Sequence, residues 1–510
     1  MRESPATRER PRDRSSRAAL FCHDLPSQPK AQVGIILVTG ASGYIGGRLV
    51  PELLARGYRV RVMIRAASSE CTWRWPGVEV AVADVLSGEG LRDALLGVDT
   101  AYYLIHSLLL GPKRFAEADI WAAHNFRKAA EEAQVTRIIY LGGLGDLTAQ
   151  LSPHLRSRME VAAELQRASI PVTVLRASVI IGSGSASYEI IEHLARSSRF
   201  ILAPRWADNR CQPIGIRDVI KYLVGALETP ETEGRSFDIG GCDILTYRQM
   251  LKHIARVLGR PIFIVTGPSL SIGFYAYLAS LRTPVPAAIT RCLFGGLQNE
   301  VVCQDDTIKS LLPFEPIGYE EAVRRAMRME EQDSIRTRWS DAYPPSHASA
   351  LKLHELKNPP KYVARYSLTT HAAPEALFQS ICKIGGKHGW FRNNWMWRLR
   401  GMIDRILLGV GTSRGRRSYS TLNVDDVIDF WRVEDLEPNR RLLLRAEMIL
   451  PGRAWLEFEI AEKPDHNVLT ISAHFDTCTI RGTLYWCFFM PFHRFIFMHL
   501  IQQIERTSLR

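Results

Sequence analysis

The sequence lacks the patterns that mark a disulfide framework, a metal centre or a membrane span near its middle. Nine cysteines and 14 histidines are scattered over 510 residues, with no C-x-x-C pair and no H-E-x-x-H motif. Structural zinc sites and zinc hydrolases need such spacings. The apolar stretch Ile272–Leu281 is too short to cross a bilayer, and Pro284 and Pro286 soon follow it. We therefore expect a cytoplasmic protein with reduced cysteines and no bound metal.

The first 32 residues lack the apolar segment of a secretory signal. They contain many arginines among serine, proline and aspartate, a composition that does not support a packed core. We expect residues 1–32 to form a disordered basic tail, and an organelle-targeting segment is the alternative. The whole chain has a net charge of +12, which favours acidic ligands such as phosphates, nucleic acids or anionic membranes.

From Val33 onward, short β-branched runs alternate with amphipathic helical stretches. This alternation is typical of a doubly wound parallel sheet, that is, an α/β Rossmann domain. The predicted strands are Ile35–Thr39, Arg59–Ile64, Val78–Ala83, Thr100–Ile105, Arg137–Leu141 and Val172–Arg176. The predicted helices are Tyr44–Arg56, Leu91–Leu96, Phe115–Glu132, His154–Ala168, Asp218–Glu228, Tyr247–Leu258 and Tyr319–Met329. We place a nucleotide-binding domain at 33–330, with its Rossmann core at about 33–180 and a substrate lobe at about 181–330.

A polar segment with two Pro-Pro pairs covers residues 331–360, and we interpret it as a linker. The periodicity then changes, which predicts a separate α+β domain at 361–507. Its predicted strands are Tyr362–Thr369, Val427–Val433, Leu442–Ile449, Ala454–Ala461 and Leu469–Thr477. Its predicted helices are Pro374–Ile384, Trp395–Leu408 and Phe492–Glu505. The order suggests an antiparallel sheet wrapped around a long last helix.

The run from Thr39 to Gly46 (TGASGYIG) follows an apolar strand and opens an amphipathic helix. Gly40 permits the tight turn, Gly43 lets the backbone approach a pyrophosphate, and Gly46 lets helix and strand pack closely. The helix start adds N–H donors and a partial positive charge. In this context a dinucleotide site is favoured over a plain glycine-rich turn. The other loop residues expected at the cofactor are Ser42, Tyr44 and Ile45.

The second strand ends at Arg65, where an NAD-binding domain usually has an acidic residue. A cation there suits a ribose 2′-phosphate, so we expect NADP(H) to be preferred, with NAD(H) as the alternative. A solvated loop arginine would give the same sequence. Asp84 closes the third strand, and two roles remain open for it: accepting a bond from the adenine amine, or capping a helix.

These residues resemble the atypical short-chain dehydrogenase/reductase (SDR) superfamily, in the branch near the NmrA-like regulators and the Rossmann subunit of respiratory complex I. The resemblance covers roughly 33–330. It is carried by the glycine loop, the step Ala83–Val85, the run Tyr102–Ser107 (YYLIHS) and the run Gln212–Val219 (QPIGIRDV). The resemblance implies that Leu104 and Ile105 flank the adenosine, and we also expect Val85, next to Asp84, in the cofactor site.

The second half resembles an uncharacterised domain found fused behind such Rossmann domains. The resemblance is carried by Trp397–Gly401 (WRLRG), Asp429–Val433 (DFWRV) and Glu447–Leu456 (EMILPGRAWL). The strand and helix order is similar to the helix-grip (SRPBCC, START-like) fold. That similarity implies a hydrophobic small molecule held between the sheet and the last helix.

The chain departs from a standard SDR reductase at the catalytic positions. Such enzymes use a Ser after the fifth strand and a Tyr and a Lys four residues apart on the next helix. Here the strand ends in Gly142 and Gly143, and His154 and Arg158 have the four-residue spacing. A histidine can act as an acid near neutral pH, and Arg158 can bind ribose or phosphate. The alternative is that His154 caps a helix and Arg158 lies on the surface.

The C-terminal domain contains a cluster of arginines with tryptophans interleaved at its start. The arginines include Arg392, Arg398, Arg414, Arg416 and Arg417. No nucleic-acid-binding motif accompanies them, so we expect a solvated face with some affinity for phosphates or lipid headgroups and no nucleic-acid partner. In the last helix, Phe492, Phe495 and Ile496 share one side with later apolar residues. We expect it to pack on the sheet, with peripheral membrane contact as the second interpretation.

Two functions follow from these features. The first is an NADPH-preferring oxidoreductase that acts on a hydrophobic small molecule. The second is a non-catalytic, NmrA-like dinucleotide sensor or assembly factor with a ligand-binding C-terminal domain. The missing Ser, Tyr and Lys favour the second, whereas the pairing of a hydride-donor site with a predicted apolar pocket favours the first.

Overall fold

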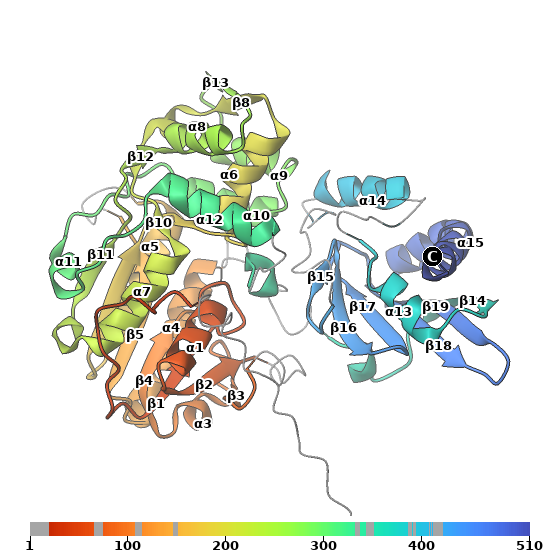
Figure 1. Ribbon diagram of the computed structural model, residues 1–510, viewed down its shortest axis with the longest axis horizontal. Helices are drawn as coiled ribbons and strands as arrows, with labels where there is room; N and C mark the ends of the chain where they lie inside the picture. Colours follow the sequence, from red (N-terminus) through yellow and green to blue (C-terminus); the bar gives the residue numbers. More distant parts are fainter. Residues whose placement is uncertain are drawn as a thin grey trace, which may run out of the picture.

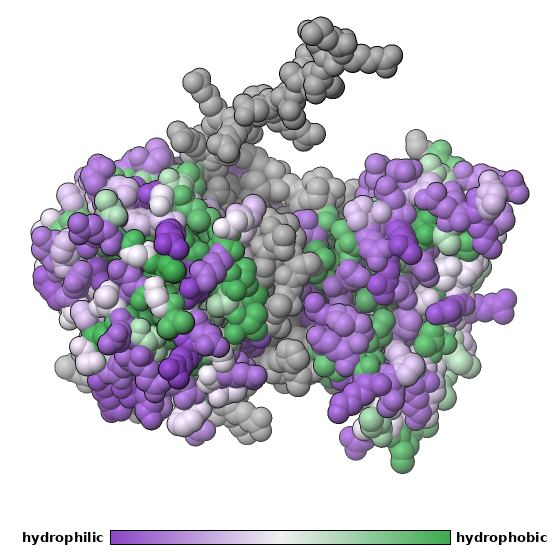
Figure 2. Space-filling model, turned by 90° about the horizontal axis from the view of Figure 1, so that it is seen from below, coloured by the Kyte–Doolittle hydropathy of each residue, from purple (hydrophilic) through white to green (hydrophobic). Residues whose placement is uncertain are grey.

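The computed structural model describes residues 20–65, 75–107, 115–145, 151–331, 337–342, 351–385, 390, 394–406, 409, 411 and 422–509. It has a large lobe built on a parallel sheet and a smaller lobe built on an antiparallel sheet (Figure 1). Hydrophilic side chains dominate the view from below, with hydrophobic ones in smaller patches (Figure 2).

A seven-stranded parallel sheet forms the centre of the large lobe, in the order β11-β6-β5-β4-β1-β2-β3. Its strands are β1 (Ile35–Val38), β2 (Arg59–Ile64), β3 (Glu79–Val82), β4 (Val98–Tyr103), β5 (Arg137–Gly143), β6 (Val172–Ala177) and β11 (Ser236–Ile239). The order reverses between β1 and β4, which is the doubly wound arrangement expected from the sequence. The seventh strand, β11, was not predicted.

Helices cover both faces of this sheet. On one face lie α1 (Gly46–Ala55) and α7 (Ile216–Glu228), which share a core with the strands. On the other lie α3 (Leu91–Leu95), α4 (Phe115–Glu132) and α5 (Pro153–Leu165). Burial on both faces explains why β1 is a continuous apolar run, IILV, rather than an alternating one. The predicted Rossmann core is thus present, with element ends shifted by a few residues.

Most of the remainder of the large lobe sits above the sheet in Figure 1. Its helices are α6 (Ala186–Ser197), α8 (Tyr247–Val257), α9 (Ile272–Ser280), α10 (Ala287–Gly296), α11 (Thr307–Leu311) and α12 (Tyr319–Glu331). Three two-stranded sheets connect them: β7 (Ile180–Ile181) with β10 (Ile214–Gly215), β9 (Arg210–Cys211) with β12 (Leu245–Thr246), and β8 (Phe200–Ala203) with β13 (Phe263–Thr266).

The small lobe is a six-stranded antiparallel sheet in the order β14-β19-β18-β17-β16-β15. Its strands are β14 (Tyr362–Thr370), β15 (Val427–Ile428), β16 (Trp431–Glu437), β17 (Arg441–Ala446), β18 (Arg453–Glu462) and β19 (Asn467–Asp476). The helices α13 (Pro374–Ile381), α14 (Asn394–Ile406) and α15 (Ile480–Ser508) complete it. The domain is α+β as expected, while its identity with the helix-grip fold stays a prediction.

The last helix is longer than the sequence suggested. We placed its start after Pro491 because proline disfavours a helix interior, but α15 begins at Ile480 and contains Pro491. Thr479 caps it, since its side chain accepts a hydrogen bond from the Gly482 N–H at 3.1 Å. One lost backbone bond is tolerated in a helix of 29 residues that is held on the sheet by Trp486 near one end and by Phe497 and Ile501 toward the other.

Part of the expected tail belongs to the folded domain. Residues 1–19 lie outside the described residues, but Cys22 and Leu25 are buried in the core beside α1. The Phe21 N–H donates to the Glu52 carboxylate at 2.7 Å, and Lys221 pairs with Asp24 at 2.9 Å. The composition of the segment concealed these contacts, because they involve only a few apolar side chains among many polar ones.

Candidate functional site

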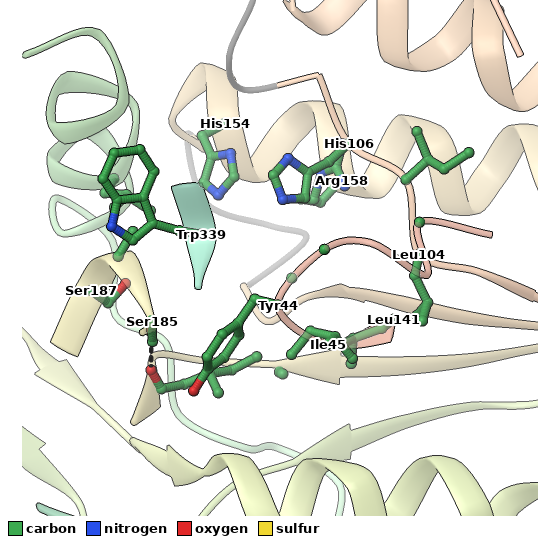
Figure 3. Close-up of a pocket in the computed structure, with 18 of the residues that line it drawn as sticks. Tyr44, Ile45, Leu104, His106, Leu141, His154, Arg158, Ser185, Ser187 and Trp339 are labelled. Atoms are coloured by element: carbon green, nitrogen blue, oxygen red, sulfur yellow. Dashed lines mark hydrogen bonds between the residues drawn. The ribbon is translucent and has the colours of Figure 1, made fainter. Parts of the chain in front are cut away.

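A cavity of about 460 Å³ opens at the carboxyl ends of the parallel strands. It lies where β1 and β4 part in sheet order, which is the place where doubly wound sheets bind ligands. The glycine loop forms its floor, and the ends of β2, β3, β5 and β6 contribute further walls. Figure 3 shows Tyr44 and Ile45 of the loop below His154.

The glycines of the loop have the geometry that the sequence predicted. Gly40 adopts a φ of +61°, and a Cβ there would lie 2.9 Å from the Leu104 carbonyl oxygen. A Cβ on Gly46 would lie 2.8 Å from the Cα of Ala41, so only glycine allows this approach of α1 to the loop. The first helical turn of α1 therefore faces the cavity closely, with the N–H groups that a helix start leaves without intrahelical partners.

The structure brings all the predicted site residues to this one cavity. Its lining includes Gly40, Ser42, Gly43, Tyr44, Ile45, Gly46, Arg65, Asp84, Val85, Leu104, Ile105, His154 and Arg158. Arg65 follows β2 and is exposed at the edge, within electrostatic reach of Asp84. Asp84 Oδ1 accepts from the Leu86 N–H at 2.8 Å, so this carboxylate caps a turn rather than a helix while it lines the cavity.

His106, His154 and Arg158 form a cluster on one side of the cavity. In Figure 3 the two imidazoles lie side by side, with Trp339 on the far side of His154. His106 comes from the segment after β4, whereas His154 and Arg158 come from the first turns of α5. We did not expect His106 in the site. Its position directly after Leu104 and Ile105, at the end of a central strand, was the available signal.

The alternative expectation, that His154 caps a helix and Arg158 lies on the surface, is wrong. Ser152 caps α5, because its hydroxyl accepts from the Leu155 N–H at 3.3 Å. Arg158 is buried and forms an ion pair with the buried carboxylate of Asp119 on α4. Asp119 is further held by the Ser107 N–H at 2.6 Å. Arg158 is therefore a fixed cation at the cavity wall and not a surface residue.

Both histidines of the cluster are biased toward their neutral form. Burial, followed by the positive charge of Arg158, lowers the pKa of His154 to about 3. Enclosure among the cavity residues, followed by the charge of Arg158, lowers the pKa of His106 to about 4, although part of this residue is exposed. Among the described residues, His154 Nδ1 and Ser178 Oγ have no hydrogen-bond partner although both are buried. Other buried atoms without a partner lie elsewhere in both lobes, but these two line the cavity, where a ligand could pair with them.

The opposite wall is apolar. Ile190 comes from α6, Ile289, Leu293 and Phe294 come from α10, and Trp339 comes from the segment that we interpreted as linker. None of these was predicted as a site residue, because helices α6 and α10 approach the Rossmann core only in three dimensions. The cavity thus combines the glycine loop, a polar cluster and an apolar wall.

Residues 337–340 hold this wall against the glycine loop. The Thr337 hydroxyl donates to the Tyr44 carbonyl at 2.9 Å, and the buried Arg48 guanidinium donates to the Thr337 carbonyl at 2.9 Å. Trp339 Nε1 donates to Glu189 at 2.7 Å. From the small lobe, Arg432 donates to the Ser340 carbonyl at 2.7 Å. This segment is a structural connection between the two lobes, whereas its polar composition suggested only a solvated linker.

Comparison with known families assigns each lobe. Residues 32–274 match the model of the NmrA-like family. Residues 32–274 of the large lobe form an NmrA-like Rossmann domain. This domain is similar to proteins of the SDR and epimerase type. Residues 358–500 match the family "protein of unknown function (DUF2867)", which agrees with the expected uncharacterised second domain.

Relatives of the NmrA-like domain have diverse names. The chain is 23% identical over 252 residues to photosystem II assembly factor Ycf39 of Trieres chinensis, a match to 48% of this chain and 77% of that protein. It is 27% identical to epimerase family protein SDR39U1 of Bos taurus, covering 51% and 86%. It is 25% identical to ceramide reductase of Caulobacter vibrioides, covering 44% and 71%. It is 33% identical to sterol demethylase protein B of Methylococcus capsulatus, but over only 34% of that protein.

Solved structures resemble the same domain at low identity. A nucleoside-diphosphate-sugar epimerase from Staphylococcus aureus has a TM-score of 0.46 and 17% identity, covering 57% of this chain and 99% of that one. MoeE5 in complex with UDP-glucuronic acid and NAD has a TM-score of 0.47 and 18% identity, covering 59% and 99%.

Proposed function

We propose that the protein is an NAD(P)-dependent oxidoreductase, with a preference for NADPH, that acts on a hydrophobic carbonyl compound or the matching alcohol. One observation carries the proposal: the glycine loop, the His106–His154–Arg158 cluster and an apolar wall share a single cavity. A loop for a diphosphate alone is common to many functions. A fixed polar cluster facing an apolar wall beside that loop is what an oxidoreductase for an apolar substrate requires.

The residues present suit a dinucleotide. The cradle that side chains on Gly40 and Gly46 would fill gives a diphosphate close access to the start of α1. Asp84, Val85, Leu104 and Ile105 would hold the adenosine. Arg65 would pair with a ribose 2′-phosphate from its exposed position at the cavity edge, which is the basis for the NADPH preference.

When bound, the nicotinamide supplies a hydride, and the chain's own residues manage the substrate oxygen. A neutral His154 donates a hydrogen bond to that oxygen, as its low pKa allows over the physiological range. The positive charge of Arg158 stabilises the negative charge that develops there, because both lie in an environment with little water. Asp119 keeps the guanidinium in place. His154 thus stands where a standard SDR has its tyrosine, but it acts as a hydrogen-bond donor and not as the acid, because its pKa is too low. Arg158 orients and stabilises without transferring a proton, and the proton that completes the alcohol comes from solvent water.

The apolar wall supports a hydrophobic substrate. Leu293, Phe294 and Trp339 offer large apolar surfaces and no charge to a bound molecule. The names of several relatives, among them ceramide reductase and sterol demethylase protein B, are in keeping with such a substrate. A second hydrophobic ligand in the C-terminal domain, as a helix-grip fold would hold, is a separate proposal.

The test is a titration of purified full-length protein with NADPH and NADH, followed by turnover assays with long-chain and polycyclic ketones. We expect nucleotide-dependent turnover that His154→Ala and Arg158→Ala each lower by a factor of about one hundred or more. His371→Ala replaces an exposed histidine of the small lobe and serves as the matched control with unchanged turnover. Full activity in the His154 variant would refute its role.

A second candidate function is a non-catalytic dinucleotide sensor or assembly factor. The absence of the standard Ser, Tyr and Lys favours it, as does the name of the relative Ycf39, an assembly factor. Tight nucleotide binding without turnover on the whole panel of ketones and alcohols would favour the sensor and count against the enzyme. Failure to bind either nucleotide would refute both.

A further inference from the structure

Two helices of the small lobe expose apolar side chains at regular helical spacing. On α15 the outward positions are Leu484, Cys487, Phe488, Pro491, Phe492 and Phe495. On α14 they are Trp395, Leu399, Met402, Ile403 and Ile406. Residues spaced by three and four positions share one side of a helix. Each helix therefore presents an apolar stripe to solvent, and we call these residues the outer stripes.

The outer stripe of α15 is separate from the side of the helix that packs inside the protein. Trp486, Phe497 and Ile501 are buried against the antiparallel sheet, whereas Leu484 is 64% exposed and Phe488 is 67% exposed. The most apolar 18-residue window of α15 has a mean hydropathy of 1.2, and only 22% of it is buried. A helix that is apolar on both sides has more apolar surface than its own domain covers.

Both outer stripes lie on the same side of the small lobe and point away from its sheet. Trp397 of α14 and Trp486 of α15 pack in one core on one face of the six-stranded sheet. Figure 1 shows α14 and α15 above that sheet. The two outward surfaces are therefore presented on the same side of the domain.

Most charged side chains on α14 and α15 themselves are positive. α15 contains Arg481 and Arg494, both exposed, and its first acidic residue is Glu505, near the opposite end. Lys361 lies beside the start of α15, with its Nζ 3.4 Å from the Thr483 hydroxyl. The one acidic residue of α14, Asp404, is buried and accepts from the N–H groups of Gly411 and Ile449.

We propose that the outer stripes of α14 and α15 dock the protein peripherally on an anionic lipid bilayer. Apolar and aromatic side chains would enter the boundary between headgroups and acyl chains, and the arginines and Lys361 would meet the negative headgroups. A second copy of the chain fits less well, because two molecules with a net charge of +12 each repel. The proposal does not depend on the dinucleotide site.

Docking in this way would bring the cavity wall close to the bilayer. Arg405 of α14 donates to the Leu281 carbonyl, at the end of α9, at 2.9 Å. α9 packs on α10, which contributes Leu293 and Phe294 to the cavity. An apolar substrate dissolved in the membrane would then be near the lobe that we propose to bind it.

The experiment is co-sedimentation of the full-length protein, without nucleotide, with vesicles of phosphatidylcholine alone or mixed with phosphatidylglycerol. We expect strong binding to the mixed vesicles and weak binding to the neutral ones. The double variant Leu484→Asp/Phe488→Asp should weaken binding by about tenfold or more, because two exposed apolar contacts are replaced by charges that headgroups repel. Arg494→Glu should weaken it by about fivefold or more on anionic vesicles only.

The matched control is Phe263→Asp on β13, an aromatic residue that is 60% exposed on the other lobe; it should bind like the unmodified protein. Trp395→Asp tests the stripe on α14 independently, so the proposal remains testable if one variant fails to fold. If the protein binds neither the neutral nor the mixed vesicles, the proposal is overturned. It is also overturned if the stripe variants bind the mixed vesicles as well as the control does. A dimer that Phe488→Asp dissociates, without vesicle binding, would assign the surface to a second copy instead.

Discussion

Arg65 is the residue on which we propose that cofactor preference depends. It follows β2, lies exposed at the edge of the cavity and has Asp84 within electrostatic reach. A guanidinium in this place distinguishes the two cofactors only through the 2′-phosphate, because the remainder of the dinucleotide is the same in both.

Arg65→Asp should therefore weaken NADPH binding by about tenfold to a hundredfold and leave NADH binding nearly unchanged, since a charge-assisted hydrogen bond is worth about 1.5–3 kcal/mol. The measurement is a fluorescence titration with each nucleotide. Arg59→Asp, at the opposite end of the same strand, is the control. Equal losses for both nucleotides would mean that Arg65 does not select the cofactor.

The histidine cluster predicts a pH dependence of stability. Burial and Arg158 lower the pKa of His154 to about 3 in the folded protein, whereas an unfolded histidine titrates near pH 6.5. Between these values the unfolded chain binds the extra proton, so the free energy of unfolding falls as the pH falls from about 6.5 toward 3.

His154→Asn should reduce this dependence, and the difference between the two proteins should reach up to about 2 kcal/mol between pH 7 and pH 5. Urea unfolding at the two pH values measures it, and the comparison cancels the titration of groups common to both proteins. If both proteins lose the same stability on acidification, His154 is not held in its neutral form.

Among the elements, the strand–loop–helix unit β1–α1 is the one that sequence determines most directly. A side chain on Gly46 would meet backbone atoms of the loop, including the Cα of Ala41 at 2.8 Å. Gly46→Ala should lower the free energy of unfolding by about 1–3 kcal/mol and weaken nucleotide binding, because α1 must move away from the loop. Thermal unfolding with and without NADPH measures both effects.

Gly273→Ala on α9 is the matched control, because a Cβ there has its nearest neighbour at 3.8 Å. It should leave both stability and nucleotide binding unchanged. Unaltered nucleotide binding by Gly46→Ala would show that the close approach of α1 to the loop is not needed for the site.

For the whole molecule, the connection through residues 337–340 links the cavity to the small lobe. Thr337→Val keeps the shape of the side chain but removes the hydroxyl that bonds Tyr44 and Arg48. We expect a loss of about 1–2 kcal/mol in unfolding free energy and weaker nucleotide binding, because Tyr44 belongs to the glycine loop. Calorimetry with and without NADPH checks both.

Thr470→Val serves as the control for this change. Its hydroxyl bonds Ser367 at 3.0 Å at an exposed position of the small lobe, so its loss should cost little. A Thr337 variant that behaves like the control would mean that the segment is only a tether between the lobes.

Local patterns were sufficient for most elements of the Rossmann core. Phe115–Glu132 was predicted with the bounds that α4 has, because an amphipathic period of this length leaves little ambiguity. β11 was missed because a short edge strand carries little signal of its own and gains its place only by pairing with β6. Val427–Val433 was predicted as one strand but is divided into β15 and β16, with Asp429 at a φ of 56°.

The sequence by itself determined the conformation of the glycine loop and the order of the Rossmann elements. These features depend on residues that are close together in the chain, where glycine geometry and hydrophobic period act directly. Only the tertiary structure decided that Arg158 pairs with Asp119, that His106 joins His154, and that Trp339 closes the cavity. Such contacts join segments far apart in the chain, and their free energy comes from burial and pairing that no local pattern encodes.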